Sequence, residues 1–170
     1  MDAQYGRCKE KGVLGMTELR DVIAYFIKKY PFKSELSNAR VTKMVYLADW
    51  RHLLSFGTQI TGIKWYFDNY GPFVWDIKST AEKNPDLFAI ENTSTPYGTP
   101  KIIFDIKNLA YIPALDSNVK DSLDHVIQET KNLSYSQFIR LVYSTYPIIT
   151  SDRYTYIDLP KKAKEYLQLS

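Results

Sequence analysis

The chain has 170 residues, of which 45% are hydrophobic and 24% charged, with only 7 Gly and 8 Pro. This composition excludes a disordered or fibrous protein, and the length is sufficient to bury the core of one domain. The formal net charge is only +3. Nucleic-acid binders usually gather more positive charge on one face, so a nucleic-acid partner is not our first expectation.

The termini and the cysteine content suggest where the protein works. No apolar run approaches the ~20 residues that span a bilayer, and the first residues lack a signal-peptide pattern; we expect a cytoplasmic protein with no membrane partner. Residues 1–15 are predicted to be a flexible leader, and residues 16–170 a single domain. The single Cys8 and the separated His52 and His125 have no metal-ligand spacing, so we expect neither metal nor cofactor.

Two helices are predicted in the first third of the chain. The first begins near Thr17, a good N-cap, and ends at Pro31. Its apolar residues recur at helical spacing: Leu19, Val22, Ile23, Phe26 and Ile27. The second runs from Ser37 to Gly57, which suits the residue after a helix end. It is apolar on most sides, which is typical of a helix buried in the middle of a domain.

The pattern then changes to strands. Apolar residues alternate with polar ones over 63–67, which favours a strand. Gly71-Pro72 is predicted to open a helix that runs to Lys83, with Pro in the first turn. Residues 88–90 and 102–106 are predicted to form a hairpin whose turn spans Asn92 to Pro100.

Three more helices complete the prediction. One is capped by Asp116 or Ser117, one by Ser134, and a short one follows Asp158. Pro147 is predicted to end the second of these. The sequence does not decide whether residues 148–157 form a strand or a loop. The predicted fold is α+β and predominantly helical, with about six helices around a buried central helix and a small antiparallel sheet or hairpin.

One pair of side chains invites a catalytic interpretation. Asp49 and His52 are three residues apart on the second helix, so they could form an acid–base pair. The alternative is a structural hydrogen bond, or an Asp49 that ties down the following turn. Because no nucleophile or metal site accompanies them, we favour a structural role and predict that the protein is not an enzyme. The turns at Ile60-Thr61-Gly62 and Tyr70-Gly71-Pro72 carry too few glycines for a phosphate-binding loop.

Aromatic residues crowd the segment between those turns, and tyrosine and tryptophan are favoured anchors of protein interfaces. Trp75 falls outside the apolar face expected for its helix. The residues that we predict to contact a partner are Trp65, Tyr66, Tyr70, Phe73 and Trp75, with Arg51 and Lys64 at the rim.

The region from Lys43 to Pro72 resembles the Panacea (SocA-like) antitoxin family. The resemblance rests on Lys43 and the run Tyr46-Leu47-Ala48-Asp49 within the second helix, followed by a His three residues on, a Gly, Ile-Thr-Gly and Gly-Pro. These family-motif residues, expected to form a structural and polar cluster, are Asp49, His52, Gly57, Thr61, Gly62, Gly71 and Pro72. Two positions depart from the family pattern and bear on partner identity: Tyr146, where members often have His after Thr, and the bulky Trp75.

The resemblance implies a prokaryotic or phage-borne antitoxin, in a setting such as phage defence. Its partner would be a cognate protein toxin encoded next to it, neutralised by direct binding and occlusion. One alternative is a proteolytic adaptor that delivers the toxin to a ClpXP-type protease. Another is a nucleic-acid-binding regulator, acting for example on its own operon.

Overall fold

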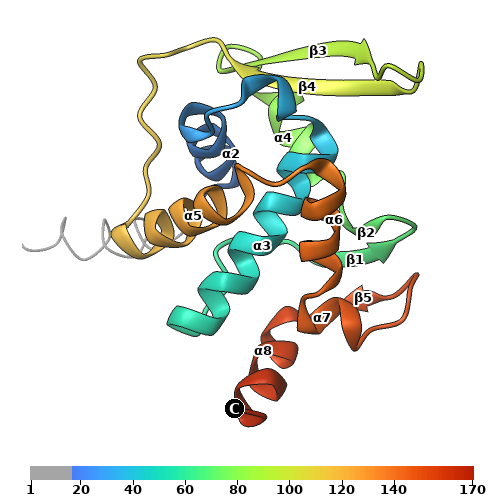
Figure 1. Cartoon of the computed structure of the whole chain (residues 1–170). Coiled ribbons are helices and arrows are strands. Elements are labelled where there is room, and N and C mark those ends of the chain that lie inside the picture. Colours follow the sequence, from blue (N-terminus) through green and yellow to red (C-terminus); the bar gives the residue numbers. More distant parts are fainter. Residues whose placement is uncertain (1–16) are drawn as a thin grey trace, which may run out of the picture.

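The computed structural model describes residues 17–170, so the predicted leader at 1–15 lies outside the described residues. Within them, the chain forms seven α-helices and two small antiparallel sheets that lie at the edges of the helical part (Figure 1), which confirms the predominantly helical α+β class. The helices are α2 (Leu19–Lys29), α3 (Asn38–Phe56), α4 (Asp76–Lys83), α5 (Ser117–Thr130), α6 (Tyr135–Tyr143), α7 (Tyr146–Ile149) and α8 (Leu159–Gln168), with a 3-10 turn at Lys33–Glu35.

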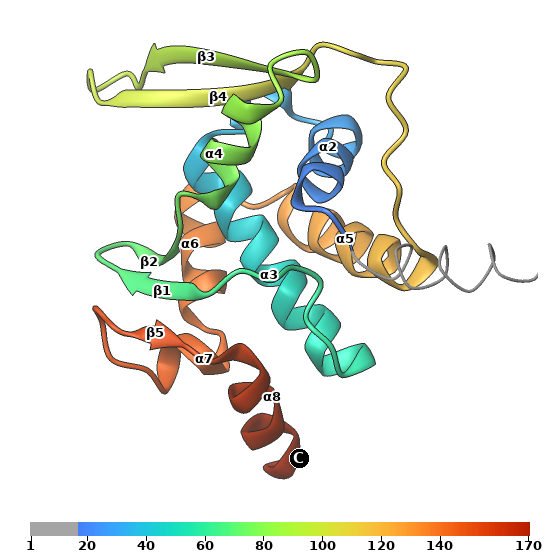
Figure 2. The same ribbon diagram turned by 180° about the vertical axis from the view of Figure 1, so that it is seen from behind.

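The central helix is α3, which lies between α5 and α6 in the two opposite views of Figures 1 and 2. Fourteen of its nineteen residues are buried, on every side of the helix. It begins where the Ser37 hydroxyl accepts a hydrogen bond from the backbone N–H of Arg40. It ends at Gly57, whose φ of 79° is left-handed, a conformation that glycine adopts without a steric penalty.

The first sheet has the strand order β2-β1-β5, with β1 (Trp65–Asp68) antiparallel to both neighbours. The predicted helix start at Gly71-Pro72 is wrong: these residues belong to β2 (Gly71–Phe73), and α4 begins only at Asp76. The reason is that this segment pairs with β1. Proline is tolerated there because β2 is an edge strand, and the missing N–H would not have bonded to the neighbouring strand. The third strand, β5 (Tyr156–Ile157), lies in the region that the sequence left undecided.

The second sheet is the hairpin of β3 (Phe88–Ser94) and β4 (Pro100–Ile106). It is longer than predicted, because Asn92, Thr93 and Ser94 pair with β4 although the sequence placed them in the turn. Backbone pairing does not require apolar side chains, so a polar stretch can extend a ladder. The Phe104 N–H donates to the Leu36 carbonyl at 2.9 Å, which attaches the hairpin to the start of α3.

Most of the later helices begin at the residue that the sequence suggested. The side chains of Asp116, Ser134 and Asp158 each accept a backbone hydrogen bond at the start of a helix. Pro147 follows the end of α6 but lies in the first turn of the short α7, where a proline ring costs no hydrogen bond.

Two glycines of the family motif provide a matched test of this geometry. At both Gly57 and Gly62 an added methyl group would meet no atom within 4 Å, but only Gly57 has a positive φ. Gly57→Ala should therefore lower the free energy of unfolding by about 1 kcal/mol through backbone strain alone. Gly62→Ala should leave it unchanged or raise it slightly. Urea unfolding of both variants measures the difference, and equal losses would contradict the assignment.

Candidate functional site

The most constrained polar group in the described structure is the Asp49 carboxylate, which is completely buried in the middle of α3. Its Oδ1 accepts the backbone N–H of Thr61 at 2.9 Å. Its Oδ2 accepts three further bonds, from Gln59 Nε2 at 3.0 Å, Thr61 Oγ1 at 2.5 Å and Trp65 Nε1 at 2.9 Å. Asp49 thus holds the chain from residue 59 to the start of β1 against α3.

Burial determines the protonation behaviour of this carboxylate. Removal from water raises the pKa of Asp49 to about 6, while the hydrogen bonds from Thr61, Trp65 and Gln59 act in the opposite direction. The free-energy cost of removing the charge from water exceeds the stabilisation of the charge by the four hydrogen bonds. The group therefore binds a proton more readily in the folded state than in the unfolded chain.

His52 does not form the acid–base pair that its spacing allowed. Its Nδ1 donates to the Thr58 carbonyl oxygen at 2.6 Å, and its ring lies 4.9 Å from that of Phe56. The imidazole therefore fixes the turn after α3 rather than orienting on Asp49. Within residues 17–170, no three His, Cys, Asp or Glu side chains gather as metal ligands would.

Gly71 is required by its backbone conformation rather than by lack of space. Its φ of 100° is strained for any other residue, whereas a methyl group there would make only ordinary contacts, 3.4 Å from the Tyr143 ring and 3.8 Å from Lys43 Cε. Lys43 is itself almost fully buried; burial lowers its pKa to about 8, against the raising influence of Asp68. Like Asp49 and His52, Gly71 belongs to the family motif and has a structural environment.

The opposite face of the same sheet is aromatic. Along β1, Trp65 and Phe67 are buried, whereas Tyr66 between them lies on the outer face. Tyr66 pairs across the strands with Phe73 of β2 and with Tyr156 of β5. The Tyr66 and Tyr156 ring centroids are 5.2 Å apart.

Trp75 extends this arrangement, because its ring meets that of Phe73 edge to face at 5.0 Å. We call the four residues Tyr156, Tyr66, Phe73 and Trp75 the aromatic row. Its two ends are the most accessible members, with Tyr156 74% and Trp75 63% exposed. Lys78 Nζ lies 5.6 Å from the Trp75 ring, and Lys64 lines a shallow pocket together with Tyr156. A contiguous exposed apolar patch with a charged rim marks an interaction site.

The remaining predicted contact residues lie elsewhere. Trp65 has no exposed surface, and because its indole N–H is bonded to Asp49, it cannot contact a partner of the folded protein. Tyr70 is 81% exposed at the β1–β2 turn, but it lines a different groove with Tyr135 and Ile102. Arg51 lies on α3 beside His125 and Glu129 of α5, away from the row.

Tyr156 is the residue that sequence reasoning missed. Its strand is two residues long and belongs to a sheet only because it pairs with β1. The alternation of Tyr154, Thr155, Tyr156 and Ile157 is a weak strand signal, and it gave no indication of which partner strand lay nearby.

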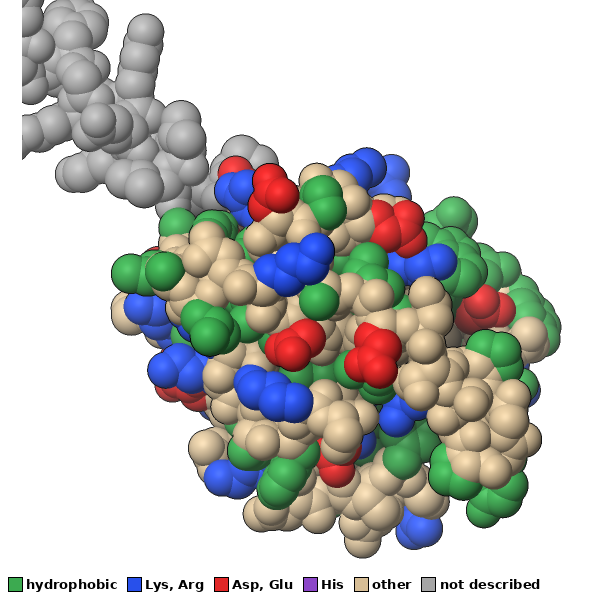
Figure 3. All heavy atoms as spheres, turned by 90° about the horizontal axis from the view of Figure 1, so that it is seen from above, with side chains coloured by type: hydrophobic (Ala, Val, Ile, Leu, Met, Phe, Trp, Pro, Cys, Tyr) green, Lys and Arg blue, Asp and Glu red, His purple; other side chains and the backbone are tan. Residues whose placement is uncertain are grey.

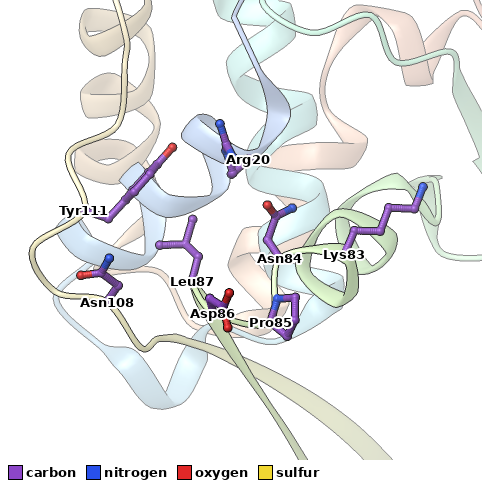
Figure 4. A pocket seen from close by; sticks show the side chains of 8 residues that line it. All are labelled: Arg20, Lys83, Asn84, Pro85, Asp86, Leu87, Asn108 and Tyr111. Carbon is purple, nitrogen blue, oxygen red and sulfur yellow. The ribbon is translucent and has the colours of Figure 1, made fainter.

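The surface cavities of the described structure include four of about 230 to 630 Å³, and neither Asp49 nor His52 lines any of these four. Figure 4 shows one of about 290 Å³, where Leu87 lies among Arg20, Asn84, Asn108 and Tyr111. Arg20 donates to Glu18 at 2.8 Å, so its charge is already paired. These cavities do not connect the buried carboxylate with solvent.

Comparison with known proteins identifies the family. The model of the antitoxin SocA-like, Panacea domain family matches residues 41–147, more than half of the chain. The chain therefore belongs to that family, which confirms the resemblance found in the sequence. No curated protein and no solved structure matches it. In residues 17–170, no helix is both long and apolar enough to cross a bilayer.

The raised pKa of Asp49 predicts a pH dependence of stability. Because the folded pKa of about 6 exceeds the ordinary 3.8, folding favours the protonated carboxyl. Its contribution to the free energy of unfolding is full below pH 4 and is lost as pH rises through 6, by about 3 kcal/mol in total.

Asp49→Asn provides the reference for this measurement, because its amide does not titrate. The variant is less stable in absolute terms, since its NH₂ group must face a donor. Urea unfolding at several pH values should show the stability advantage of the wild type over Asp49→Asn shrinking between pH 4 and pH 7.5. A constant difference would show that the carboxylate keeps its ordinary pKa.

Proposed function

We propose that this protein is an antitoxin that neutralises a protein toxin by binding it on the aromatic row. Membership of the SocA-like antitoxin family supports a toxin as partner. We choose this surface because the aromatic row, Tyr156, Tyr66, Phe73 and Trp75, lies on the outer face of the sheet with its rings in contact. The partner would be made in the same cytoplasm and encoded next to this chain.

The row has the physical properties of a binding anchor. Tyr66 and Phe73 are half-buried between their cross-strand neighbours, so their rings lose little conformational freedom when a partner covers them. Tyr156 and Trp75 still offer most of their surface for burial. Lys64 and Lys78 supply charge at the rim, where it affects association more than final affinity.

Occlusion follows from this arrangement without any chemistry by the antitoxin. A partner seated on the sheet face would have the contacted part of its surface covered for as long as the complex lasts. A nucleic-acid target fits less well on the side that carries the β3–β4 hairpin, because basic and acidic side chains are interspersed over the face seen in Figure 3. Phosphate backbones favour a concentrated basic patch.

The test is co-expression with the protein encoded by the neighbouring reading frame. The expected result is that the neighbour alone stops growth, that this chain restores it, and that the two proteins co-purify. A stable toxin level during rescue supports occlusion, whereas rapid loss of the toxin that depends on a ClpXP-type protease would support the adaptor. A neighbour that is harmless on its own would contradict the proposal.

Trp75→Ala should weaken the complex about 30-fold or more, the effect of losing one anchor worth about 2 kcal/mol. The fold should be unaffected, because Trp75 packs on the surface against Phe73 and Lys78. Tyr97→Ala is the matched control: Tyr97 is 95% exposed, but it lies in the turn of the other hairpin. Isothermal calorimetry with the purified neighbouring protein measures the affinity of both variants. Equal affinities of the two variants would exclude the aromatic row as the binding surface.

A further inference from the structure

One edge of the β3–β4 hairpin has no partner in the described part of the chain. β3 forms seven residue pairs with β4 and none with any other strand. Figures 1 and 2, taken from opposite sides, both show β3 as the outermost ribbon, with β4 between it and the helices. Residues 91–94 are all exposed, so this edge faces solvent.

The hydrogen bonds on either side of the hairpin establish which residues present their backbone to that edge. The Lys107 N–H donates to the Leu87 carbonyl at 2.7 Å, whereas the Phe104 N–H points away from β3 to the Leu36 carbonyl. Because the pattern alternates along an antiparallel pair, Ile90, Asn92 and Ser94 point their N–H and C=O groups outward. Three donors and three acceptors are thus aligned along an extended backbone.

This edge lacks the usual protection against pairing. Natural edge strands are often interrupted by proline, lysine or a bulge. β3 contains neither residue type, its ladder with β4 is unbroken, and Glu91 is its only charged residue. Water satisfies these groups in the free chain, and another extended strand is the protein element that can pair all of them at once.

We propose that this strand is β3 of a second copy of the same chain, antiparallel and centred on Asn92. In that register Asn92 faces Asn92 of the partner subunit, and Ile90 faces Ser94 of the partner subunit. All six outward groups of each copy are then paired. The two hairpins become one four-stranded antiparallel sheet, in which the two open β3 edges pair with each other.

Charge favours this register over the next one. Centred on Asn92, the pairing places Glu91 opposite the partner's Thr93. Centred on Glu91, it would place two carboxylates directly opposite each other, which is destabilising. The contact is short and mostly polar, so the dimer forms in a concentration-dependent manner. It does not depend on the proposed function, because the aromatic row lies on the other sheet.

Light scattering on the full chain over a wide range of concentrations tests the proposal. The mass should rise from the 19.8 kDa of the chain towards twice that value. Asn92→Pro should weaken dimerisation about tenfold or more, because it removes the central outward N–H without breaking a bond to β4. Asn92→Thr is the control and should still dimerise. A wild-type chain that stays monomeric, or an Asn92→Pro chain that dimerises like the wild type, overturns the proposal.

Charged substitutions at Asn92 provide a second test that does not rely on the Asn92→Pro variant. Asn92→Lys and Asn92→Asp each place like charges opposite each other across the two-fold axis, so each variant alone should be monomeric at low salt. Their mixture should dimerise, because the two substituted side chains then attract. Circular dichroism checks that both variants are folded. Dimerisation of either variant alone, or a mixture that stays monomeric, would show that the copies do not meet at Asn92.

Discussion

The buried Asp49 carboxylate is the interaction on which the arrangement of the first sheet depends. It connects the central helix to three residues of the following segment through four hydrogen bonds, one of them to Trp65 in β1. β1 is the middle strand, so β2 and β5 are positioned by it. The four donors return only part of the cost of burying the charge, but they hold the sheet in a position that presents Tyr66, Phe73 and Tyr156 on one outward face.

The sequence predicted the features that are determined locally. Ser37, Asp116, Ser134 and Asp158 cap helices through hydrogen bonds to residues three positions away, so a short window contains both partners. Gly57 could likewise be placed after α3 from its neighbours alone. The apolar character of α3 on all sides indicated a central helix, because only burial within the domain removes that much apolar surface from water.

The features that the sequence did not predict are determined by distant partners. Gly71-Pro72 has the local pattern of a helix start, and pairing with β1 makes it a strand. For the candidate site, the sequence shows that residues 65–75 are rich in aromatic side chains. It does not show which of these side chains point into the core and which point to solvent. Trp65 points inward because its N–H is satisfied by a carboxylate sixteen residues earlier. Tyr156 lies ninety residues after Tyr66 and pairs with it across the strands, and no local pattern encodes that contact.

The segment after residue 147 has a consequence for how members of such a family could diverge. β5 and α8 lie beyond the portion that matches the family, yet β5 supplies the ring at one end of the aromatic row, while the motif residues hold the rest. The part of the chain that matches the family and one end of the proposed binding surface are thus encoded in separate stretches of the gene. On the proposed function, exchange of the terminal stretch would change one end of the binding surface, whereas a fragment trimmed to residues 41–147 would lose core residues on both sides, such as Phe26 and Leu159.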